Sequence, residues 1–212
     1  MSQKKREISM GFSDEKFSEG QHIIYLYNDD QERKKTVAKF LKQGILENEK
    51  LLYLVDDISP HEIQKEMSAL GVDVSDAQNA FDIRPGHYTC CPDHYFTADF
   101  MLSAVGDFYK QALQEGFAGA RGAGEMSWAL VEGRANFQEL VHYEAQLNII
   151  LHEYPLTTVC QYDARRFDGA VIMDMLSVHP LMVVRGQLVK NPSYIEPKDF
   201  LKEYQKRVHQ ES

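Results

Sequence analysis

Short apolar runs alternate with segments of helical pattern along most of this chain, and that alternation restricts its fold more than any other feature. The runs HIIYLY at 22–27, LLYLVDD at 51–57 and TTVCQYDA at 157–164 are rich in β-branched and aromatic residues, as strands buried on both faces are. Strands that are separated by helices pair in parallel through right-handed crossovers, which places helices on both faces of the sheet. The sequence therefore predicts an α/β fold with three layers, α-β-α, around a mostly parallel central sheet.

Capping residues and turn signals predict the remaining elements. Gly44 is expected to cap the helix at 30–43, and Ser59-Pro60 is expected to open the next one. Arg185-Gly186, within LMVVRGQLVKN, predicts an antiparallel hairpin near the C-terminus. The other predicted segments are strands at 80–84 and 117–124 and helices at 60–70, 97–115, 136–154, 168–177 and 197–209.

Composition argues against several classes of partner. The formal net charge of -9 and the pI near 5.4 make direct binding of nucleic acid improbable, because neutralising phosphates requires concentrated Lys and Arg. No apolar stretch approaches the roughly 20 residues of a membrane span, and three cysteines without a secretion signal do not suggest a disulfide framework. We expect a cytoplasmic protein without membrane contact, in which a polar, flexible arm at 1–20 precedes a single domain at 21–212.

Polar and glycine-rich stretches follow two of the predicted strands. In parallel sheets ligands bind at the carboxyl ends of the strands, where we expect residues 121–128 and 160–166 to lie. Glycines in the first stretch would let a ligand approach the backbone, and Trp128 could wall an apolar pocket. Arg121 is expected to pair with a carboxylate such as Glu125 or with an anionic ligand group. A tight turn with a core tryptophan is the structural alternative.

Three ordered stretches carry a family resemblance: HIIYLYNDDQERKKTVAKFLKQGILENEKLLYLVDD, ARGAGEMSWAL, and VCQYDARRF with the later HPLMVVRGQLVKNPSYIEP. Together they resemble the MEDS domain, a sensory domain named from methanogens and methylotrophs, from about Gln21 to Pro197. The resemblance implies a RecA/KaiC-like fold and the sensing of small organic compounds as the input half of a larger regulator. It also places His22, Cys160 and Tyr162 in motif stretches, where they could line the site.

The joint after the first central strand differs from a phosphate-binding loop. Such a loop needs the pattern G-x-x-x-x-G-K-[ST], in which glycine amides hold the phosphates and Lys neutralises them. This chain has acidic Asp29, Asp30 and Glu32 there instead, although Lys35-Thr36 retains the terminal Lys-Thr pair. Carboxylates in the place of phosphates repel a triphosphate, so we expect no ATPase activity and no cofactor.

These observations predict a module that binds a small organic ligand and acts through a regulatory partner, such as a histidine kinase or a transcription regulator. A homodimer is one expected assembly. The residues expected to bind the ligand are His22, Arg121, Gly124, Glu125, Trp128, Cys160, Tyr162 and Arg166.

Other functions remain open at this point. One is a degenerate RecA-like nucleotide-binding enzyme, or a hydrolase in which Cys160 and His22 form a nucleophile pair. Another is a dimerisation or interaction module that uses the C-terminal helix or hairpin. The loop at 85–96 is expected to act as a lid over the site, and the weaker alternative for this loop is a metal site formed by His87, Cys90, Cys91 and His94.

Overall fold

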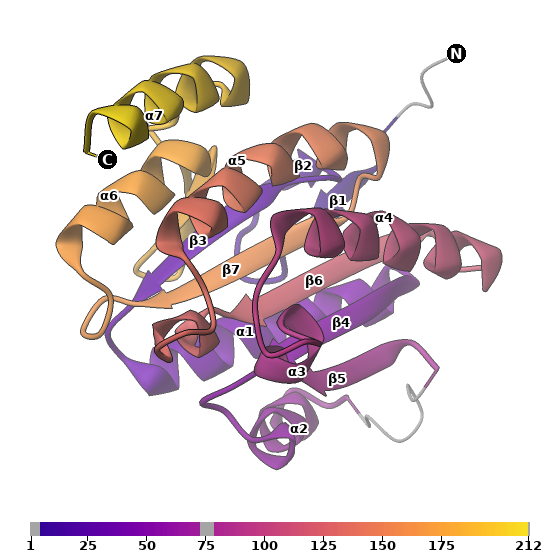
Figure 1. Ribbon diagram of the computed structural model, residues 1–212. Coiled ribbons are helices and arrows are strands. Elements are labelled where there is room, and N and C mark those ends of the chain that lie inside the picture. The colour runs from indigo at the N-terminus through magenta and orange to yellow at the C-terminus, as the bar shows by residue number, and fades with distance from the viewer. Residues whose placement is uncertain (1–4, 73–78, 212) are drawn as a thin grey trace.

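A mostly parallel sheet forms the middle layer of the protein (Figure 1). The computed structural model describes residues 5–72 and 79–211, and within them seven strands pair in the order β5-β4-β6-β7-β3-β8-β9. Every pairing in this sheet is parallel except the β8–β9 hairpin. The strands are β3 (His22–Tyr27), β4 (Glu49–Val55), β5 (Phe81–Pro85), β6 (Gly119–Glu125), β7 (Thr157–Asp163), β8 (Leu181–Val184) and β9 (Gln187–Lys190).

Helices cover both faces of the sheet, so the predicted three-layer fold is confirmed. One core packs α1 (Asp30–Leu46) and α2 (Pro60–Ala69) against the sheet. The other core involves α3 (Gly86–Cys90), α4 (Ala98–Gln114), the 3-10 turn η1 (Ser127–Leu130), α5 (Phe137–Glu153), α6 (Gly169–Val178) and α7 (Pro197–Glu211). Among the described helices, none is long and apolar enough to cross a membrane.

The N-terminal segment is ordered where the structure describes it, which corrects the prediction of a flexible arm at 1–20. Within residues 5–20, β1 (Glu7–Ser9) pairs antiparallel with β2 (Lys16–Ser18). Ile8 and Met10 are buried in the core on the α1 side of the sheet. Arg6 forms ion pairs with Glu19 and Glu49, the second of which begins β4. Ile8, Met10 and Arg6 thus attach this segment to the domain, although its sequence shows no hydrophobic periodicity.

Gly44 lies inside α1 and does not cap it, which corrects a second prediction. The helix continues to Leu46, and Glu47 is its C-cap. A Cβ atom added at Gly44 would collide with Leu51 Cδ2 and would lie 2.9 Å from Arg121 Cδ. Glycine is therefore present because a buried arginine side chain crosses the helix at close range.

We expect Gly44→Ala to lower the free energy of unfolding by up to about 2 kcal/mol. Overpacking a filled region costs about 1–3 kcal/mol, and the helix propensity of alanine offsets about 1 kcal/mol of that cost. Urea denaturation measures the change. Gly169→Ala is the matched control, because a Cβ at this helical position meets nothing within 4 Å among the described residues. Equal urea midpoints for the two variants would contradict the packing argument.

Candidate functional site

An apolar pocket lies on the face of the sheet that α3, α4 and α5 cover. Its floor consists of alternate residues of β4, β6 and β7, because side chains two apart in a strand share one face. Pairing aligns these residues in two rows, Leu52–Gly122–Thr158 and Leu54–Gly124–Cys160. Both rows have glycine in the middle strand. The floor is open at Gly124, where an added Cβ would have its nearest contact at Met126 Sδ, 3.9 Å away, whereas a Cβ at Gly122 would lie 3.1 Å from Thr158 Oγ1.

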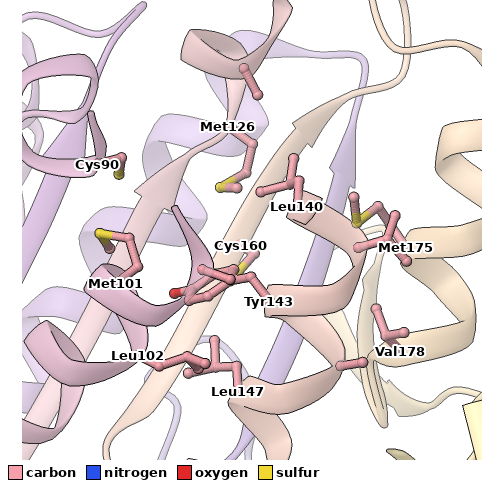
Figure 2. Close-up of a cluster of buried hydrophobic side chains, with 14 of the residues drawn as sticks. Cys90, Met101, Leu102, Met126, Leu140, Tyr143, Leu147, Cys160, Met175 and Val178 are labelled. Atoms are coloured by element: carbon pink, nitrogen blue, oxygen red, sulfur yellow. The ribbon is translucent and has the colours of Figure 1, made fainter. Parts of the chain in front are cut away.

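The walls of the pocket come from helices and loops that are distant in sequence. Trp128 is 1% exposed, and its ring centroid lies 5.3 Å from that of Phe96. In Figure 2, side chains from α3, α4, α5 and β7 converge with Met126 on the same region. The pocket has a volume of about 120 Å³. Among the pocket residues labelled in Figure 2, Cys90, Met101, Met126 and Tyr143 belong to the walls, and Cys160 belongs to the floor.

The pocket has a partly exposed mouth and a buried inner end. Arg84, which is exposed and pairs with Asp82, and the half-buried Thr89 lie at the mouth. Glu144 and Cys160 lie at the buried end. The segment at 85–96, expected to be a loop over the site, contains α3 and contributes Thr89, Cys90 and Phe96 to the pocket. An apolar molecule in the pocket would thus contact this segment directly.

A cluster of polar side chains lies at the inner end of the pocket. His22 Nε2 is 3.0 Å from Glu144 Oε2, and the Tyr162 hydroxyl donates to Glu144 Oε1 at 2.6 Å. Cys160 Sγ is 3.6 Å from His22 Nε2, and His179 Nε2 is 3.6 Å from Glu144 Oε2. All five side chains are buried. The structure thus brings together His22, Cys160 and Tyr162, which the sequence analysis had grouped on family resemblance.

Glu144 is the central residue of this cluster, and sequence analysis did not identify it. It lies in α5 four residues after Leu140 and three before Leu147, on the stripe of the helix that faces the core. A single carboxylate on an apolar stripe is the signal that could have revealed it, because a buried charge requires partners. Its partners come from β3 and β7, which the sequence cannot place beside α5.

Burial determines the ionisation of the cluster. It raises the pKa of the Cys160 thiol and of the Tyr162 hydroxyl well above their ordinary values, and the nearby Glu144 carboxylate adds to both shifts. Burial alone would also raise the pKa of Glu144, but the hydrogen bond with His22 and the other polar neighbours hold it below its ordinary value. Burial, together with His22, lowers the pKa of His179 to about 3, so this imidazole is neutral at pH 7.

Arg121 lies away from the pocket and pairs with carboxylates, as one of the two expectations had it, although the partners are Glu47 and Glu49 and not Glu125. It is fully buried on the α1 side, where it forms ion pairs with Glu47 and Glu49 and donates to the Phe40 carbonyl oxygen. Successive residues of a strand face opposite sides of the sheet. Arg121 therefore faces away from the glycines that form the pocket floor.

Glu125 shares that orientation and anchors the loop after β4. Its carboxylate accepts hydrogen bonds from the Tyr53 hydroxyl at 2.8 Å and from the backbone amides of Asp56 and Ile58 at 2.9 and 3.1 Å. Desolvation by burial raises the pKa of this carboxyl, although Arg33 and these hydrogen bonds oppose the shift. Arg166 is exposed and pairs with Asp57. Of the eight predicted residues, only Gly124, Trp128 and Cys160 line the described pocket.

The alternative metal site in the 85–96 segment is wrong for the described residues. Within the described ranges, three or more metal-ligating side chains come close together in a single group, which consists of His22, Glu144, Cys160 and His179. His87 instead lies 3.4 Å from Asp56, and His94 adopts a positive φ of 67° in the turn that follows α3. Adjacent cysteines in this segment do not converge with the two histidines.

The joint between β3 and α1 is closed by an acidic side chain. Asp29 caps α1, and its Oδ1 accepts hydrogen bonds from the backbone amides of Gln31 and Glu32 at 2.8 and 2.9 Å. These hydrogen bonds lower the pKa of the Asp29 carboxyl. The first amides of a helix are the groups that bind phosphate in nucleotide-binding folds. Here a carboxylate of the chain itself takes that position.

The sheet order defines an α/β domain, and its apolar pocket lies on one face of the sheet. A KaiC-like protein from Pyrococcus horikoshii OT3 superposes with a TM-score of 0.58 at 14% identity, covering 84% of this chain and 80% of that one. The chain belongs to the MEDS family: the model for the MEthanogen/methylotroph, DcmR Sensory domain matches residues 21–180.

A curated relative is the transcriptional repressor DcmR of Methylorubrum extorquens, which is 35% identical over 80 residues. The match spans 37% of this chain and 30% of the repressor, so it covers less than a third of that protein. The likeness to the archaeal structure shows the fold, and the family match shows a sensory domain.

We expect Glu125→Gln to lower the free energy of unfolding by about 1–3 kcal/mol, because the neutral amide loses the charge that strengthens the backbone hydrogen bonds and has an NH2 group in place of the oxygen that accepts from Tyr53. Urea denaturation followed by Trp128 fluorescence measures the loss. Glu132→Gln, at an exposed position, is the control and is expected to change stability by less than about 0.5 kcal/mol. A Glu125→Gln protein as stable as the control would show that the loop does not depend on this carboxylate.

Proposed function

We propose that this chain is a sensory domain that binds a small, mostly apolar organic molecule in the pocket over β6 and conveys its occupancy to a regulatory protein. The observation that supports the ligand is the inward-facing Gly124 in a central strand, where an added Cβ would meet nothing closer than Met126 Sδ at 3.9 Å. Glycine weakens a strand interior and is found where a ligand or another backbone approaches closely. A larger residue at this position would strengthen the strand but take up pocket space, which supports a ligand as the reason for the glycine.

The lining selects the chemistry of the ligand. Aromatic and aliphatic side chains such as Trp128, Phe96 and Leu54 favour an apolar body, and each buried methylene contributes about 0.8 kcal/mol to binding. Thr158, Glu144 and Cys160 offer polar contacts at the inner end. A volume of about 120 Å³ limits the ligand to a few non-hydrogen atoms. An organic molecule of up to about six carbons with at most one polar group fits these limits.

Signalling requires that the ligand favour one conformation. Thr89, Cys90 and Phe96 belong to the segment at 85–96, so a bound molecule adds contacts that hold this segment against the sheet. A ligand shifts a two-state equilibrium only by its difference in affinity for the two states, and a shift from 1:99 to 99:1 requires about 5.5 kcal/mol. The closed surface at α3 is then the signal that a partner reads. A transcription regulator or a histidine kinase is the proposed partner, and the repressor relative supports the former.

We also propose that the domain is not an enzyme. The raised pKa of the buried Cys160 thiol disfavours the thiolate that a nucleophilic cysteine needs. The carboxylate of Asp29 occupies the amides that would otherwise hold a phosphate.

The ligand site is tested with primary alcohols of about two to eight carbons and with benzene, by calorimetry. Affinity for the wild-type protein is expected to rise about fourfold per methylene until the pocket is full and then to fall. Gly124→Ala, whose added Cβ would have its nearest contact at Met126 Sδ, 3.9 Å away, fits the fold and occupies pocket space. We expect it to move the maximum to a shorter alcohol, and Gly124→Val to move it further.

Ala170→Val is the control for these variants, because Ala170 is exposed on α6 and lies outside the described pocket lining. It is expected to bind as the wild-type protein does. Equal affinities for wild type and both Gly124 variants, or no saturable binding of any probe, would refute the proposed pocket.

ATP with magnesium is expected to show no saturable binding up to about 1 mM, since a carboxylate competes for the helix amides and repels phosphate. Fluorescence anisotropy with a labelled ATP analogue measures this directly. Asp29→Gly, which frees the amides of Gln31 and Glu32, is the comparison and is expected to bind the analogue more tightly than wild type does. Tight, saturable binding by the wild-type protein would favour the nucleotide-binding alternative.

A further inference from the structure

Four side chains of the metal-ligating type converge behind the pocket, each from a different part of the chain. They are His22 on β3, Glu144 on α5, Cys160 on β7 and His179, which follows α6. One ligand atom from each lies within 4.8 Å of the others. None of the four residues is more than 6% exposed. Assembling four such groups in an apolar core is costly unless something compensates their desolvation.

Three of the six distances between these atoms are those of a tetrahedral metal site, one is shorter, and the two others, from His179 Nε2 to His22 and to Cys160, are no longer than 4.8 Å. Bonds of about 2.0–2.3 Å from zinc to nitrogen, oxygen and sulfur give ligand-to-ligand distances of about 3.3–3.8 Å in a tetrahedron. Cys160 Sγ lies 3.6 Å from His22 Nε2 and 3.7 Å from Glu144 Oε2. His179 Nε2 lies 3.6 Å from Glu144 Oε2, and His22 Nε2 lies 3.0 Å from it. Three of these four distances fall within the tetrahedral range, and the fourth is slightly short.

The hydrogen bonds of His179 direct a lone pair into the cluster. His179 Nδ1 lies 2.7 Å from the Met175 carbonyl oxygen, which can only accept, so Nδ1 carries the proton. In this neutral imidazole, Nε2 then has a lone pair that faces the Glu144 carboxylate. His179 Nε2 is buried and has no hydrogen-bond partner among the described residues. Two electron-rich atoms facing each other in a core repel, and a cation between them would reverse that interaction.

His22 also uses Nδ1 as a donor, but its Nε2 shares a hydrogen bond with Glu144 Oε2. Its Nδ1 lies 3.2 Å from Asn148 Oδ1, and Asn148 Nδ2 donates to the Val178 carbonyl oxygen at 2.7 Å. The amide oxygen must therefore accept from His22, which leaves Nε2 directed at Glu144 and Cys160. Metal-binding histidines usually donate their second N–H to a carbonyl or carboxylate in this way. The Tyr162 hydroxyl likewise donates a hydrogen bond to Glu144 Oε1, the oxygen that does not face the two histidines.

We infer that His22, Glu144, Cys160 and His179 bind one divalent transition-metal ion, with zinc as the best match. A mixed set of two imidazoles, a thiolate and a carboxylate suits zinc, and magnesium or calcium would require oxygen ligands. On binding, the Cys160 thiol and the His22–Glu144 pair each release one proton to solvent. The dication then balances the thiolate and the carboxylate, and both imidazoles are neutral.

The ion gives the pocket a polar inner end. Glu144 and Cys160 line the pocket and also belong to the metal cluster, whereas His22 and His179 lie outside the described lining. The ion thus sits behind two of its own ligands, and a molecule in the pocket contacts that coordination shell. The inference does not depend on the identity of the organic ligand, because metal binding is measured without it.

Cobalt(II) is the probe for the metal-free full-length chain, because it occupies zinc sites and absorbs visible light. We expect one cobalt ion per chain, strong ligand-field bands of a four-coordinate ion, and a thiolate-to-cobalt charge-transfer band in the near ultraviolet. Zinc should displace it stoichiometrically. X-ray absorption of the zinc-loaded wild-type protein should give one sulfur and three nitrogen or oxygen ligands, a measurement that needs no variant.

Variants assign the ligands. Cys160→Ser should remove the charge-transfer band and weaken cobalt binding by at least about 100-fold, whereas Cys91→Ser should leave both unchanged. Cys91 is buried and free like Cys160 but lies outside the cluster, so it is the matched control. Tyr162→Phe, which removes the hydrogen bond to Glu144 and the contact of the hydroxyl with Met175 Sδ but no ligand atom, should weaken binding by about 10–100-fold and keep the charge-transfer band.

Three results would each overturn the inference. They are the absence of stoichiometric cobalt binding, a zinc shell without sulfur, and a charge-transfer band that survives in Cys160→Ser or is lost in Cys91→Ser. Failure of the alcohol titrations with intact cobalt spectra would remove the proposed ligand and leave the metal site. The reverse result would remove the metal and leave the pocket.

Discussion

The parallel register of β4, β6 and β7 is the constraint on which the rest of the site depends. It aligns Gly122 and Gly124 between larger residues of the neighbouring strands, so the floor of the pocket is open at Gly124, in the middle of the sheet. The same alternation directs Arg121 and Glu125 to the opposite face, where they pair with the strands and helix of the other core. A shift of one residue in β6 would exchange these two sets. It would place an arginine and a glutamate in the pocket.

The two faces of the sheet have different tasks. On the α1 side, the ion pairs of Arg121 and Arg6 hold β4, β6 and the N-terminal hairpin together. On the α5 side, the core contains a pocket and a carboxylate, Glu144, surrounded by imidazoles, a thiol and a phenol. In this KaiC-like fold Asp29 caps the helix amides after β3, so a ligand site on the α5 side of the sheet does not compete with a phosphate site at that helix.

Sequence patterns predicted the elements well because strand and helix patterns are local. The capping box of Ser59 and Glu62 begins α2 where expected, and the hairpin turn lies at Arg185 and Gly186, both with positive φ. The predictions that were wrong concern positions whose structure is determined by contacts with residues distant in the sequence. Gly44 has the sequence context of a helix cap, but an arginine from β6 crosses the helix there. The first twenty residues lack a sequence pattern, and the ion pairs of Arg6 attach the described part of them, residues 5–20.

The sequence by itself determined the α/β class, the family, the acidic joint after the first strand and the glycines of β6. Each of these depends on residues that are close together in the chain. Only the tertiary structure decided which face each side chain occupies and that His22, Glu144, Cys160 and His179 meet. Their ligand atoms come from positions up to 157 residues apart in the sequence numbering, 22 against 179. No local pattern carries that information, because strand order and crossover geometry, rather than residue type, bring these positions together.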